Sequence, residues 1–284
     1  MLSLHKSMTD LSVIIVSYNT KKLTLDCVLS IEKEGSSLNK EIIVVDNGSH
    51  DGSIAAISKL RSESSKLNVR IIENKENLGF SKANNQGIKT AKGKYILLLN
   101  SDTKVKKGAL DALVNFAKIT PDAGVVASRL LNPDGSIQAS CFHFPTIKNA
   151  IFEYWLGRKG LFDKYAPKGN KPITVDASVA AAFLITPKAL SDVGLLDERY
   201  FFYMEDLDYC RQIWKTGLKV YYLPSSEVFH YHGASGKHLA NEKNQWRRLI
   251  PSSKIYHGFI KHYLLTSILW LGQKKNRLLY HGKN

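Results

Sequence analysis

The sequence predicts an α/β protein in which helices cover both faces of a mostly parallel sheet. Short stretches rich in Val, Ile and Leu alternate with segments of helical periodicity over the first 118 residues. The apolar stretches lack polar alternation, which is typical of strands buried on both faces of a parallel sheet. The repeated order of strand and helix therefore indicates a doubly wound sheet, and such sheets bind ligands at the carboxyl ends of their strands.

The predicted elements follow one another in regular order. Four strands are expected, at residues 11–17, 41–46, 69–74 and 95–100. Four helices are expected, at residues 20–35, 51–60, 81–93 and 106–118. The first helix places Leu23, Cys27 and Ile31 on one face. Thr20 and Gly35 are of the residue types favoured at its two ends.

Composition places the chain among globular proteins of a reducing compartment. Its 284 residues are 44% hydrophobic and 23% charged, which allows one large domain, or one domain with an appendage. Cys27, Cys141 and Cys210 are odd in number and lack metal-site spacing, so a disulfide framework is not expected. The start of the chain lacks the apolar run of a signal peptide, and no run reaches the ~20 residues of a membrane-spanning helix. We therefore expect a cytoplasmic protein.

Positive charge is concentrated towards the C-terminus. Of the net charge of +15, residues 237–284 carry +9, from ten Lys and Arg residues and one acid, Glu242. Such asymmetry favours a phosphate-rich partner, either nucleic acid or anionic lipid. A solvated basic tail is the simpler alternative.

The same segment has an apolar side. Beyond Pro251 a helix would place four residues on one side, Ile255, Phe259, Tyr263 and Ser267. Lys254 and Lys261 would lie elsewhere on its surface. A basic amphipathic helix of this kind lies in the membrane interface, held by apolar burial and anionic lipid together. The alternatives are that its apolar residues dock on the preceding domain or form the contact of a homodimer.

Polar residues follow all four predicted strands, at the edge where a ligand is expected. They are Ser17, Tyr18 and Asn19 after the first strand, Asp46 at the end of the second, Gly79 after the third, and Asn100 and Asp102 after the fourth. Turn formation would explain any one loop alone, but convergence from four strand ends favours a binding site. Neither G-x-G-x-x-G after the first strand nor G-x-x-x-x-G-K-[ST] occurs, so neither a Rossmann dinucleotide site nor a P-loop is predicted.

These residue types suit a nucleotide that binds with the help of a metal. Asp46 can accept a hydrogen bond from a base N–H or a ribose hydroxyl, and Tyr18 can pack against the base. Asp102 offers hard oxygen ligands to Mg²⁺ or Mn²⁺ on a diphosphate. The alternative for Asp102 is a turn or helix-capping role.

Six segments in a fixed order resemble one enzyme family. They are VIIVSYN, IIVVDNGSHDGS, ENLGFSKANNQGI, LLLNSDT, GLLDERYFFYMEDLDYCRQIWKTGLKVYYLP and VFHYHGAS. Their order over residues 11–236 resembles family-2 glycosyltransferases, most of all the rhamnosyltransferase-like bacterial branch. The resemblance implies a GT-A fold for residues 1–236, with a nucleotide-sugar half at 11–118 and an acceptor half at 119–236. Residues 237–284 would form a basic amphipathic helical extension.

The resemblance implies that the residues after the first three strands hold the donor. Tyr18 and Asp46 match positions that contact the nucleotide base and the ribose, with Ser17 and Asn19 beside them. Gly79 matches a loop glycine that lets the backbone approach the donor.

The resemblance also implies a divalent metal, Mn²⁺ or Mg²⁺, on the diphosphate. Asp102 matches the metal-binding aspartate of the D-x-D signature, and Asn100 takes its first position, where it would orient ribose or metal-bound water. His230 matches a metal or diphosphate ligand, although a lone histidine is more often a structural hydrogen-bonding residue. Asn84 stands where many relatives have an Arg, and Lys82 is the expected substitute.

Three carboxylates cluster behind a run of aromatic residues. Glu205, Asp206 and Asp208 begin a segment of helical periodicity that ends at Gly217. The helix N-terminus would stabilise a carboxylate as an anion, able to accept a proton. The resemblance assigns the catalytic base to Asp206 and the acceptor side to its two neighbours, whose alternative is an acidic N-cap.

Two further acceptor-side positions lie in the segment before these carboxylates. Ala181 leaves room for a hexose, because its side chain is small. Asp176 can hydrogen-bond a sugar or stabilise a turn.

The predicted function is transfer of a sugar, with inversion, from a nucleotide-diphosphate donor that is dTDP-rhamnose-like or UDP-linked. The acceptor would be a hydroxyl of a glycan or lipid-linked glycan in cell-surface polysaccharide synthesis. The enzyme would work at the inner face of the cell membrane and would not bind nucleic acid. A nucleotidyltransferase would require a Gly-rich loop with Arg and Lys after the first strand, which VSYNTKKL does not supply. In a nucleic-acid-binding protein, Asp102 and Asp206 would repel phosphate.

Overall fold

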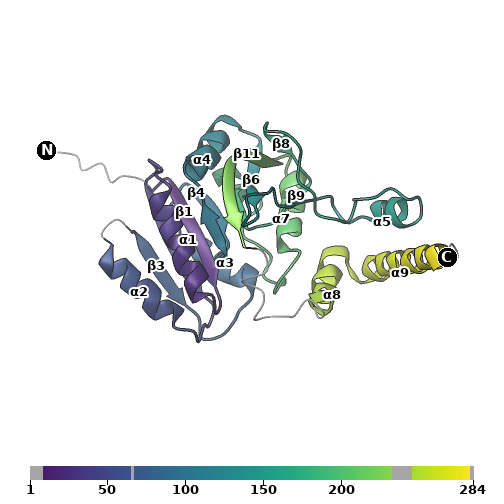
Figure 1. The fold of residues 1–284 in the computed structure, drawn as a ribbon, viewed down its shortest axis with the longest axis horizontal. Helices are drawn as coiled ribbons and strands as arrows, with labels where there is room; N and C mark the ends of the chain where they lie inside the picture. The colour runs from purple at the N-terminus through teal and green to yellow at the C-terminus, as the bar shows by residue number, and fades with distance from the viewer. Residues whose placement is uncertain (1–8, 65–66, 232–244, 282–284) are drawn as a thin grey trace.

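Four parallel strands form one half of the central sheet (Figure 1). The computed structural model describes residues 9–64, 67–231 and 245–281. The strands are β1 (Leu11–Ser17), β2 (Lys40–Asp46), β3 (Val69–Glu73) and β4 (Tyr95–Leu99). The helices that follow them are α1 (Lys21–Lys33), α2 (Ser53–Glu63), α3 (Phe80–Thr90) and α4 (Ala109–Ile119). The eight elements predicted from the sequence are therefore confirmed.

The sheet continues into the second half of the chain without interruption. Its remaining strands are β5 (Thr103–Val105), β6 (Ala123–Leu131), β8 (Ile173–Thr174), β10 (Ala182–Ile185) and β11 (Lys219–His230). The strand order is β3-β2-β1-β4-β10-β6-β11-β5, with β8 paired to β11. Strand β10 runs antiparallel to both β4 and β6, so it joins the two halves of the chain. Strands β7 (Cys141–Phe142) and β9 (Ala177–Ser178) form a separate two-stranded sheet.

Apolar side chains fill both faces of the sheet, which explains why the strands lack polar alternation. Val13 and Ile15 of β1 belong to the cluster that packs against α1 and α4. Ile14 between them belongs to the other cluster, which includes residues of α3 and of α7 (Glu205–Lys215). Because successive side chains of a strand point to opposite faces, a strand covered on both sides must be apolar throughout.

The C-terminal segment forms two helices. Helix α8 (Gln245–His257) contains Pro251, and α9 (Phe259–His281) follows it. The prediction of one continuous helix beyond Pro251 is wrong, because Gly258 separates the two with a φ of +75°, a conformation that glycine adopts readily. Ile255 and Phe259 therefore lie on different helices.

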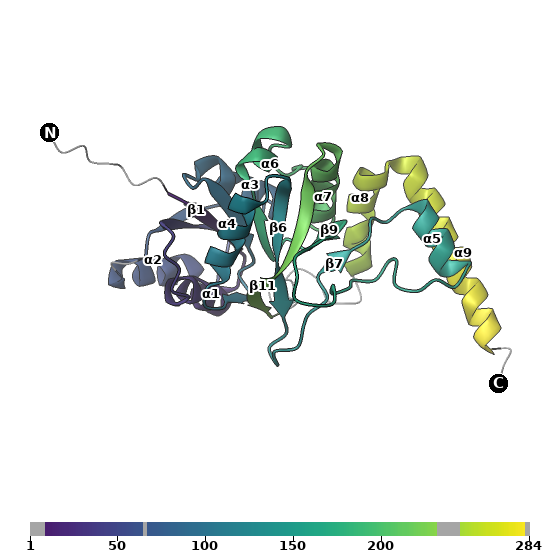
Figure 2. The same cartoon turned by 90° about the horizontal axis from the view of Figure 1, so that it is seen from above.

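Helix α8 docks on the preceding domain, which was one of the alternatives for this segment. The Arg211 guanidinium of α7 lies 3.9 Å from the centroid of the Tyr256 ring, and its Nη1 donates to the Tyr256 carbonyl at 2.9 Å. Ser252 Oγ donates to the Phe202 carbonyl at 2.9 Å. Figures 1 and 2 show α9 leading away from the sheet, with α5 (Ile147–Tyr154) beside it. Each helix within the described ranges is too short or too polar to cross a bilayer.

Candidate active site

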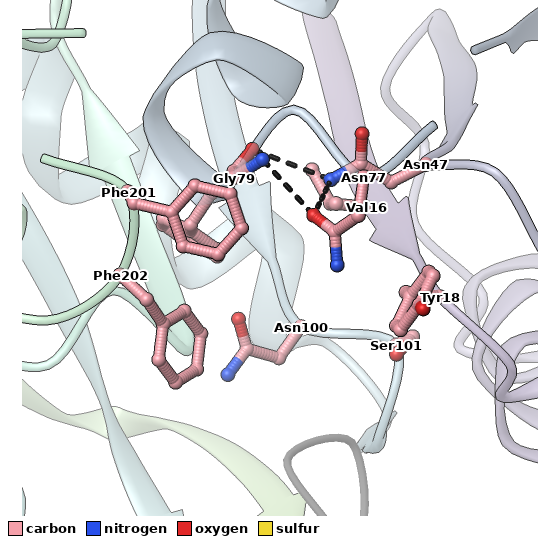
Figure 3. A pocket seen from close by; sticks show the side chains of 10 residues that line it. Val16, Tyr18, Asn47, Asn77, Gly79, Asn100, Ser101, Phe201 and Phe202 are labelled. Carbon is pink, nitrogen blue, oxygen red and sulfur yellow. Dashed lines mark hydrogen bonds between the residues drawn. The ribbon is translucent and has the colours of Figure 1, made fainter. Parts of the chain in front are cut away.

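A pocket lies at the carboxyl ends of β1, β2 and β4, where the sequence predicts a ligand. This strand-end pocket has a volume of about 80 Å³ and is lined by Val16, Tyr18, Asn47, Asn77, Gly79, Phe80, Asn100, Ser101, Phe201 and Phe202. Figure 3 shows Tyr18 and Ser101 facing Phe201 and Phe202, with Asn100 between them. Of the predicted donor residues, Tyr18, Gly79 and Asn100 line this pocket.

Asn47, which the sequence reading missed, holds the loop on one side of the pocket. Its Nδ2 donates to Asn77 Oδ1 at 2.8 Å and to the Gly79 carbonyl at 3.3 Å (Figure 3), while its Oδ1 accepts from the Leu78 N–H at 3.0 Å. Asn47 directly follows β2, but within DNGS it looked like an ordinary turn residue.

Gly79 is required by its surroundings. Its φ is +87°, and a Cβ there would lie 2.6 Å from the Phe201 carbonyl oxygen. The next residue, Phe80, donates its N–H to the same carbonyl at 2.8 Å. The loop thus lies directly against the segment that leads into α7.

The other residues at the ends of β1 and β2 differ in how their side chains are satisfied. Asp46 is fully buried; its Oδ1 accepts from the Ser49 N–H at 2.8 Å. Its Oδ2 is buried and has no hydrogen-bond partner within the described residues. The Ser17 hydroxyl bonds Thr24 Oγ1 at 2.9 Å, and Asn19 Oδ1 accepts from the His50 N–H at 2.8 Å. Asp46 therefore has one carboxylate oxygen without a partner among the described residues, whereas the side chains of Ser17 and Asn19 brace the loops. None of the three residues lines the strand-end pocket.

Two further predicted donor residues, both on α3, also lie outside the strand-end pocket. Asn84 on α3 is buried and donates to the Phe80 carbonyl of its own helix at 2.9 Å. Lys82 is exposed and attracted to Glu198. Neither lines the strand-end pocket, because α3 turns both side chains elsewhere.

A larger hollow adjoins the strand-end pocket. This central cavity has a volume of about 380 Å³ and is lined by Phe80, Asn100, Asp102, Phe142, Lys164, Val179, Ala180, Ala181, Phe202, Tyr203, Met204, Glu205, Asp206, Leu207, His230 and Leu249. Phe80, Asn100 and Phe202 line both hollows, so the two are neighbours. The cavity brings together the predicted Asp102, His230, Ala181, Glu205 and Asp206.

Asp206 lies in the first turn of α7, at one wall of the cavity. Its Oδ1 accepts from the Leu207 N–H at 2.8 Å, and its Oδ2 from the Ala180 N–H at 3.4 Å. Desolvation by the surrounding protein nevertheless raises the pKa of Asp206, against the lowering effects of these N–H groups and of Lys164. Desolvation thus outweighs the expected stabilisation of the anion by the helix end. A base with a raised pKa accepts a hydroxyl proton more readily.

The turn that presents Asp206 is strained. Tyr203 and Met204 have φ values of 70° and 69°, which non-glycine residues rarely adopt. Such residues cost about 1–3 kcal/mol each and persist where the surrounding structure enforces them, often at functional sites.

The two carboxylates beside Asp206 differ in position. Glu205 lines the cavity and is only 6% exposed, and its Oε2 has no hydrogen-bond partner in the part of the chain that is described. Burial, and then the Asp206 carboxylate, raise the pKa of Glu205 well above its usual range, which favours its neutral form. Asp208 lies outside the cavity lining, since its Oδ1 accepts from Arg211 and Gln212.

Asp176 also lies outside the cavity lining. Its Oδ2 contacts His143 Nδ1 at 3.2 Å and accepts from the Phe144 N–H at 3.3 Å. The carboxylate thus stabilises the segment after β7, which corresponds to the turn role left open by the sequence.

Asp102 and His230 form a pair that lines the same cavity as Asp206. Asp102 Oδ1 lies 3.5 Å from His230 Nε2, and both residues are buried. His230 Nδ1 lies 2.7 Å from Gln138 Oε1, which fixes the ring and directs Nε2 towards Asp102. Among the residues described, no group of three or more His, Cys, Asp or Glu could hold a metal. A carboxylate and an imidazole nevertheless fit Mn²⁺ or Mg²⁺ when diphosphate oxygens and water supply the other ligands.

The two hollows lie side by side at the strand ends of the α/β sheet, and together they form the candidate site. The sequence model of Glycosyl transferase family 2 matches residues 12–177, and the chain belongs to this family. The chain is 29% identical over 208 residues to an N-acetylglucosaminyl-diphospho-decaprenol L-rhamnosyltransferase of Mycobacterium tuberculosis. That match covers 67% of this chain and 66% of the relative, so the chain spans just under two thirds of the relative's length.

Solved structures confirm the predicted GT-A fold. A mannosyltransferase from Pyrobaculum calidifontis, in complex with GDP-Man and Mn²⁺, has a TM-score of 0.60 at 17% identity, over 89% of this chain and 63% of that one. GalNAc-T7 with UDP, GalNAc and Mn²⁺ has a TM-score of 0.62 at 18% identity, over 80% of this chain and 44% of that one. At these identities the likeness shows the fold alone.

Proposed function

We propose that the protein transfers a sugar, with inversion, from a nucleotide-diphosphate donor to a hydroxyl of a glycan or lipid-linked glycan acceptor. One observation carries this proposal: Asp206 and the Asp102–His230 pair line one cavity, and that cavity adjoins a pocket at the strand ends. The Mycobacterium tuberculosis relative is an N-acetylglucosaminyl-diphospho-decaprenol L-rhamnosyltransferase, which supports a lipid-linked acceptor and a rhamnose donor. The donor would thus be dTDP-rhamnose-like, with a UDP-sugar as the alternative.

The nucleotide would occupy the strand-end pocket. Tyr18, which lines this pocket, would pack against the base. Asp46 ends β2 directly before the pocket residue Asn47, and its buried Oδ2 would accept a hydrogen bond from the base or the ribose. Asn100 borders both hollows, so the diphosphate would pass beside it into the central cavity.

Asp102 Oδ1 and His230 Nε2 would hold a divalent metal on the diphosphate. Such an ion neutralises the charge that develops on the leaving phosphate. Gln138 would contribute by keeping His230 Nδ1 engaged, so that Nε2 remains directed to the site.

Asp206 would act as the general base. Its carboxylate would accept the proton of the acceptor hydroxyl, whose oxygen forms the new bond to C1 from the face opposite the departing diphosphate. Ala181 would leave room for the sugar, and the neutral Glu205 would avoid a second charge beside the base.

A donor screen tests this function. The full chain is incubated with a panel of UDP-, GDP- and dTDP-sugars and Mn²⁺ or Mg²⁺, and release of nucleoside diphosphate is measured with and without a synthetic N-acetylglucosaminyl-diphospho-lipid. We expect release to depend on one donor, on the metal and on the acceptor, with an inverted anomeric configuration by NMR. Release of pyrophosphate from a nucleoside triphosphate and a sugar phosphate would instead establish a nucleotidyltransferase.

We further propose that α5 and α9 contact an anionic membrane, at the inner face of the cell membrane. The helix-pair surface consists of their exposed apolar residues, Ile151, Trp155, Leu156, Phe259, Ile260, Tyr263, Leu264, Trp270 and Leu271. These are more than half of the large exposed apolar residues in the described chain. Residues 245–281 contain no acidic residue, which suits an anionic lipid surface.

Close packing joins the two helices. Trp155 Nε1 donates to the Ile268 carbonyl at 3.2 Å. A Cβ at Gly272 would lie 2.6 Å from Tyr154 Cβ, so glycine permits the approach. Lys275 Nζ lies 5.2 Å from the centroid of the Trp155 ring, which places a cation beside the apolar surface.

Vesicle flotation of the full chain tests the membrane contact. The double substitution Ile260→Ser with Trp270→Ser should weaken binding to vesicles of phosphatidylglycerol and phosphatidylcholine, because these side chains are 81% and 59% exposed. Ile119→Ser on α4, at a side chain 80% exposed, is the matched control and should bind like the wild type. Unchanged flotation together with a lower mass by light scattering would instead assign the surface to a homodimer.

A further inference from the structure

Lys164 has a distinct place in the central cavity. Of the described residues that line the cavity, it is the only Lys or Arg. It lies in the segment between α5 and β8, and the residue is exposed to solvent. Nothing in the sequence pointed to it, because the segment between 155 and 172 carries no motif.

A short series of backbone pairings places Lys164 close to Asp206. The neighbouring Tyr165 exchanges two hydrogen bonds with Cys141 of β7, each of 2.9 Å. Strand β7 pairs with β9, and Ala180, just after β9, donates to Asp206 Oδ2 at 3.4 Å. Lys164 Nζ lies 5.4 Å from the centroid of the Phe142 ring, which restricts its stem. Lys164 and the backbone N–H that donates to Asp206 thus both lie next to the same two-stranded sheet.

The other titratable groups around Asp206 leave Lys164 as the one Lys or Arg among the described residues that line the cavity. Glu205 is beside Asp206, and burial, followed by the Asp206 carboxylate, raises the pKa of Glu205, which favours its neutral form. Cys210 and Cys141, which pack behind, are also neutral, since burial raises the pKa of both thiols, that of Cys141 to about 12. Asp102 and His230 line the same cavity, and Asp208 is paired with Arg211. Desolvation by the surrounding protein lowers the pKa of Lys164, and the Asp206 carboxylate partly offsets this effect. In turn, the Lys164 amine lowers the pKa of Asp206 against the larger raising effect of desolvation.

We infer that Lys164 is a positioning residue that holds the Asp206 carboxylate in its ionised form inside the cavity, an inference that rests on the proposed role of Asp206 as the base. Desolvation disfavours the charged form of a carboxylate, and an opposite charge a few ångströms away restores it. Lys164 acts through Asp206, so its effect is on the pH at which the base becomes available.

Carbon-13 NMR of the Asp carboxyl groups in the full chain tests the pairing without any substrate. Asp206→Asn identifies the Asp206 signal. Lys164→Met should raise the pKa of Asp206 by about one unit, in line with the usual effect of removing a nearby opposite charge. Lys164→Arg should restore it, and Lys168→Met, which removes an exposed cation from the same segment, should leave it unchanged. An unchanged titration of Asp206 in Lys164→Met would overturn the inference.

The pH dependence of kcat gives a second readout. In Lys164→Met the acid limb of the kcat profile should move to higher pH by as much as the pKa of Asp206 rises. In Lys164→Arg the acid limb should lie at the wild-type pH. An unmoved acid limb with a raised KM for the acceptor would assign Lys164 to acceptor binding and overturn the inference. If Asp206→Asn keeps full transfer activity although the NMR titration shifts, the proposed base role fails and the pairing of Lys164 with Asp206 stands.

Discussion

Replacing Asp206 by Asn separates catalysis from donor binding. Asn has nearly the same shape, and its Oδ1 can still accept from the Leu207 N–H, now 2.8 Å from Asp206 Oδ1. It cannot take a proton from the acceptor hydroxyl. General bases contribute ~10²–10⁴-fold, so we expect kcat to fall by at least ~10². The affinity for the donor nucleotide should stay within about twofold, because Asp206 does not line the strand-end pocket, which contains Tyr18.

The same substitution should not weaken the fold at neutral pH. The pKa of Asp206 is raised in the folded state, so the folded chain binds the proton more tightly than the unfolded chain. The free energy of unfolding then falls as the pH rises from the pKa of Asp206 in the unfolded chain through its pKa in the folded chain. The total loss is about 1.4 kcal/mol for each pH unit by which the two pKa values differ. Asn carries no charge, and the variant should be at least as stable as the wild type at pH 7.

Three measurements decide this prediction. They are single-turnover transfer at saturating donor, calorimetry with the nucleoside diphosphate, and thermal unfolding between pH 5 and 8. Asp192→Asn is the control, because Asp192 lies on α6 (Pro187–Asp192) and pairs with Lys188 at 2.7 Å, outside the cavity lining. Transfer at more than about a third of the wild-type rate would refute the assignment of Asp206.

The remaining predictions concern the metal and the loop against α7. Asp102→Ala should weaken donor binding and remove its dependence on Mn²⁺ or Mg²⁺, and EDTA should inactivate the wild type; activity indifferent to chelation would remove the metal role of both Asp102 and His230. Gly79→Ala should destabilise the fold by about 1–3 kcal/mol by thermal unfolding, since Gly79 has a φ of +87° and a Cβ would lie 2.6 Å from the Phe201 carbonyl oxygen. Gly135→Ala has a similar φ of +84° but open space around its Cβ, so a loss as large as that of Gly79→Ala would contradict the steric part of the argument.

The parallel half of the fold could be predicted because its signals are local. Both faces of β1, β2 and β4 are buried, so these strands contain short apolar runs that stand out between polar loops. The second half is less regular: β7, β8 and β9 have two residues each, which is too short for any periodicity. The break at Gly258 was missed because one glycine between two helical segments also suits an uninterrupted helix.

The site could be predicted where residues directly follow strands or share a motif. Asp102 and His230 are 128 positions apart, yet Asp102 directly precedes β5 and His230 ends β11, and these two strands pair through Thr103 and His230. Lys164 and Leu249 reach the cavity only through tertiary packing, which no local pattern encodes. Asp176 and Asp208 were predicted to lie on the acceptor side, because a carboxylate can hydrogen-bond a sugar. In the structure they contact His143 and Arg211 instead, and neither lines the cavity.

Through Leu249, the C-terminal segment also contributes to the wall of the central cavity. Leu249 belongs to α8, and it lines the cavity that also contains Asp206. The wall on that side is therefore supplied by a helix that docks on α7 through the contact of Tyr256 with Arg211. A substitution at Leu249 changes the shape of the cavity without altering any residue that lines the strand-end pocket.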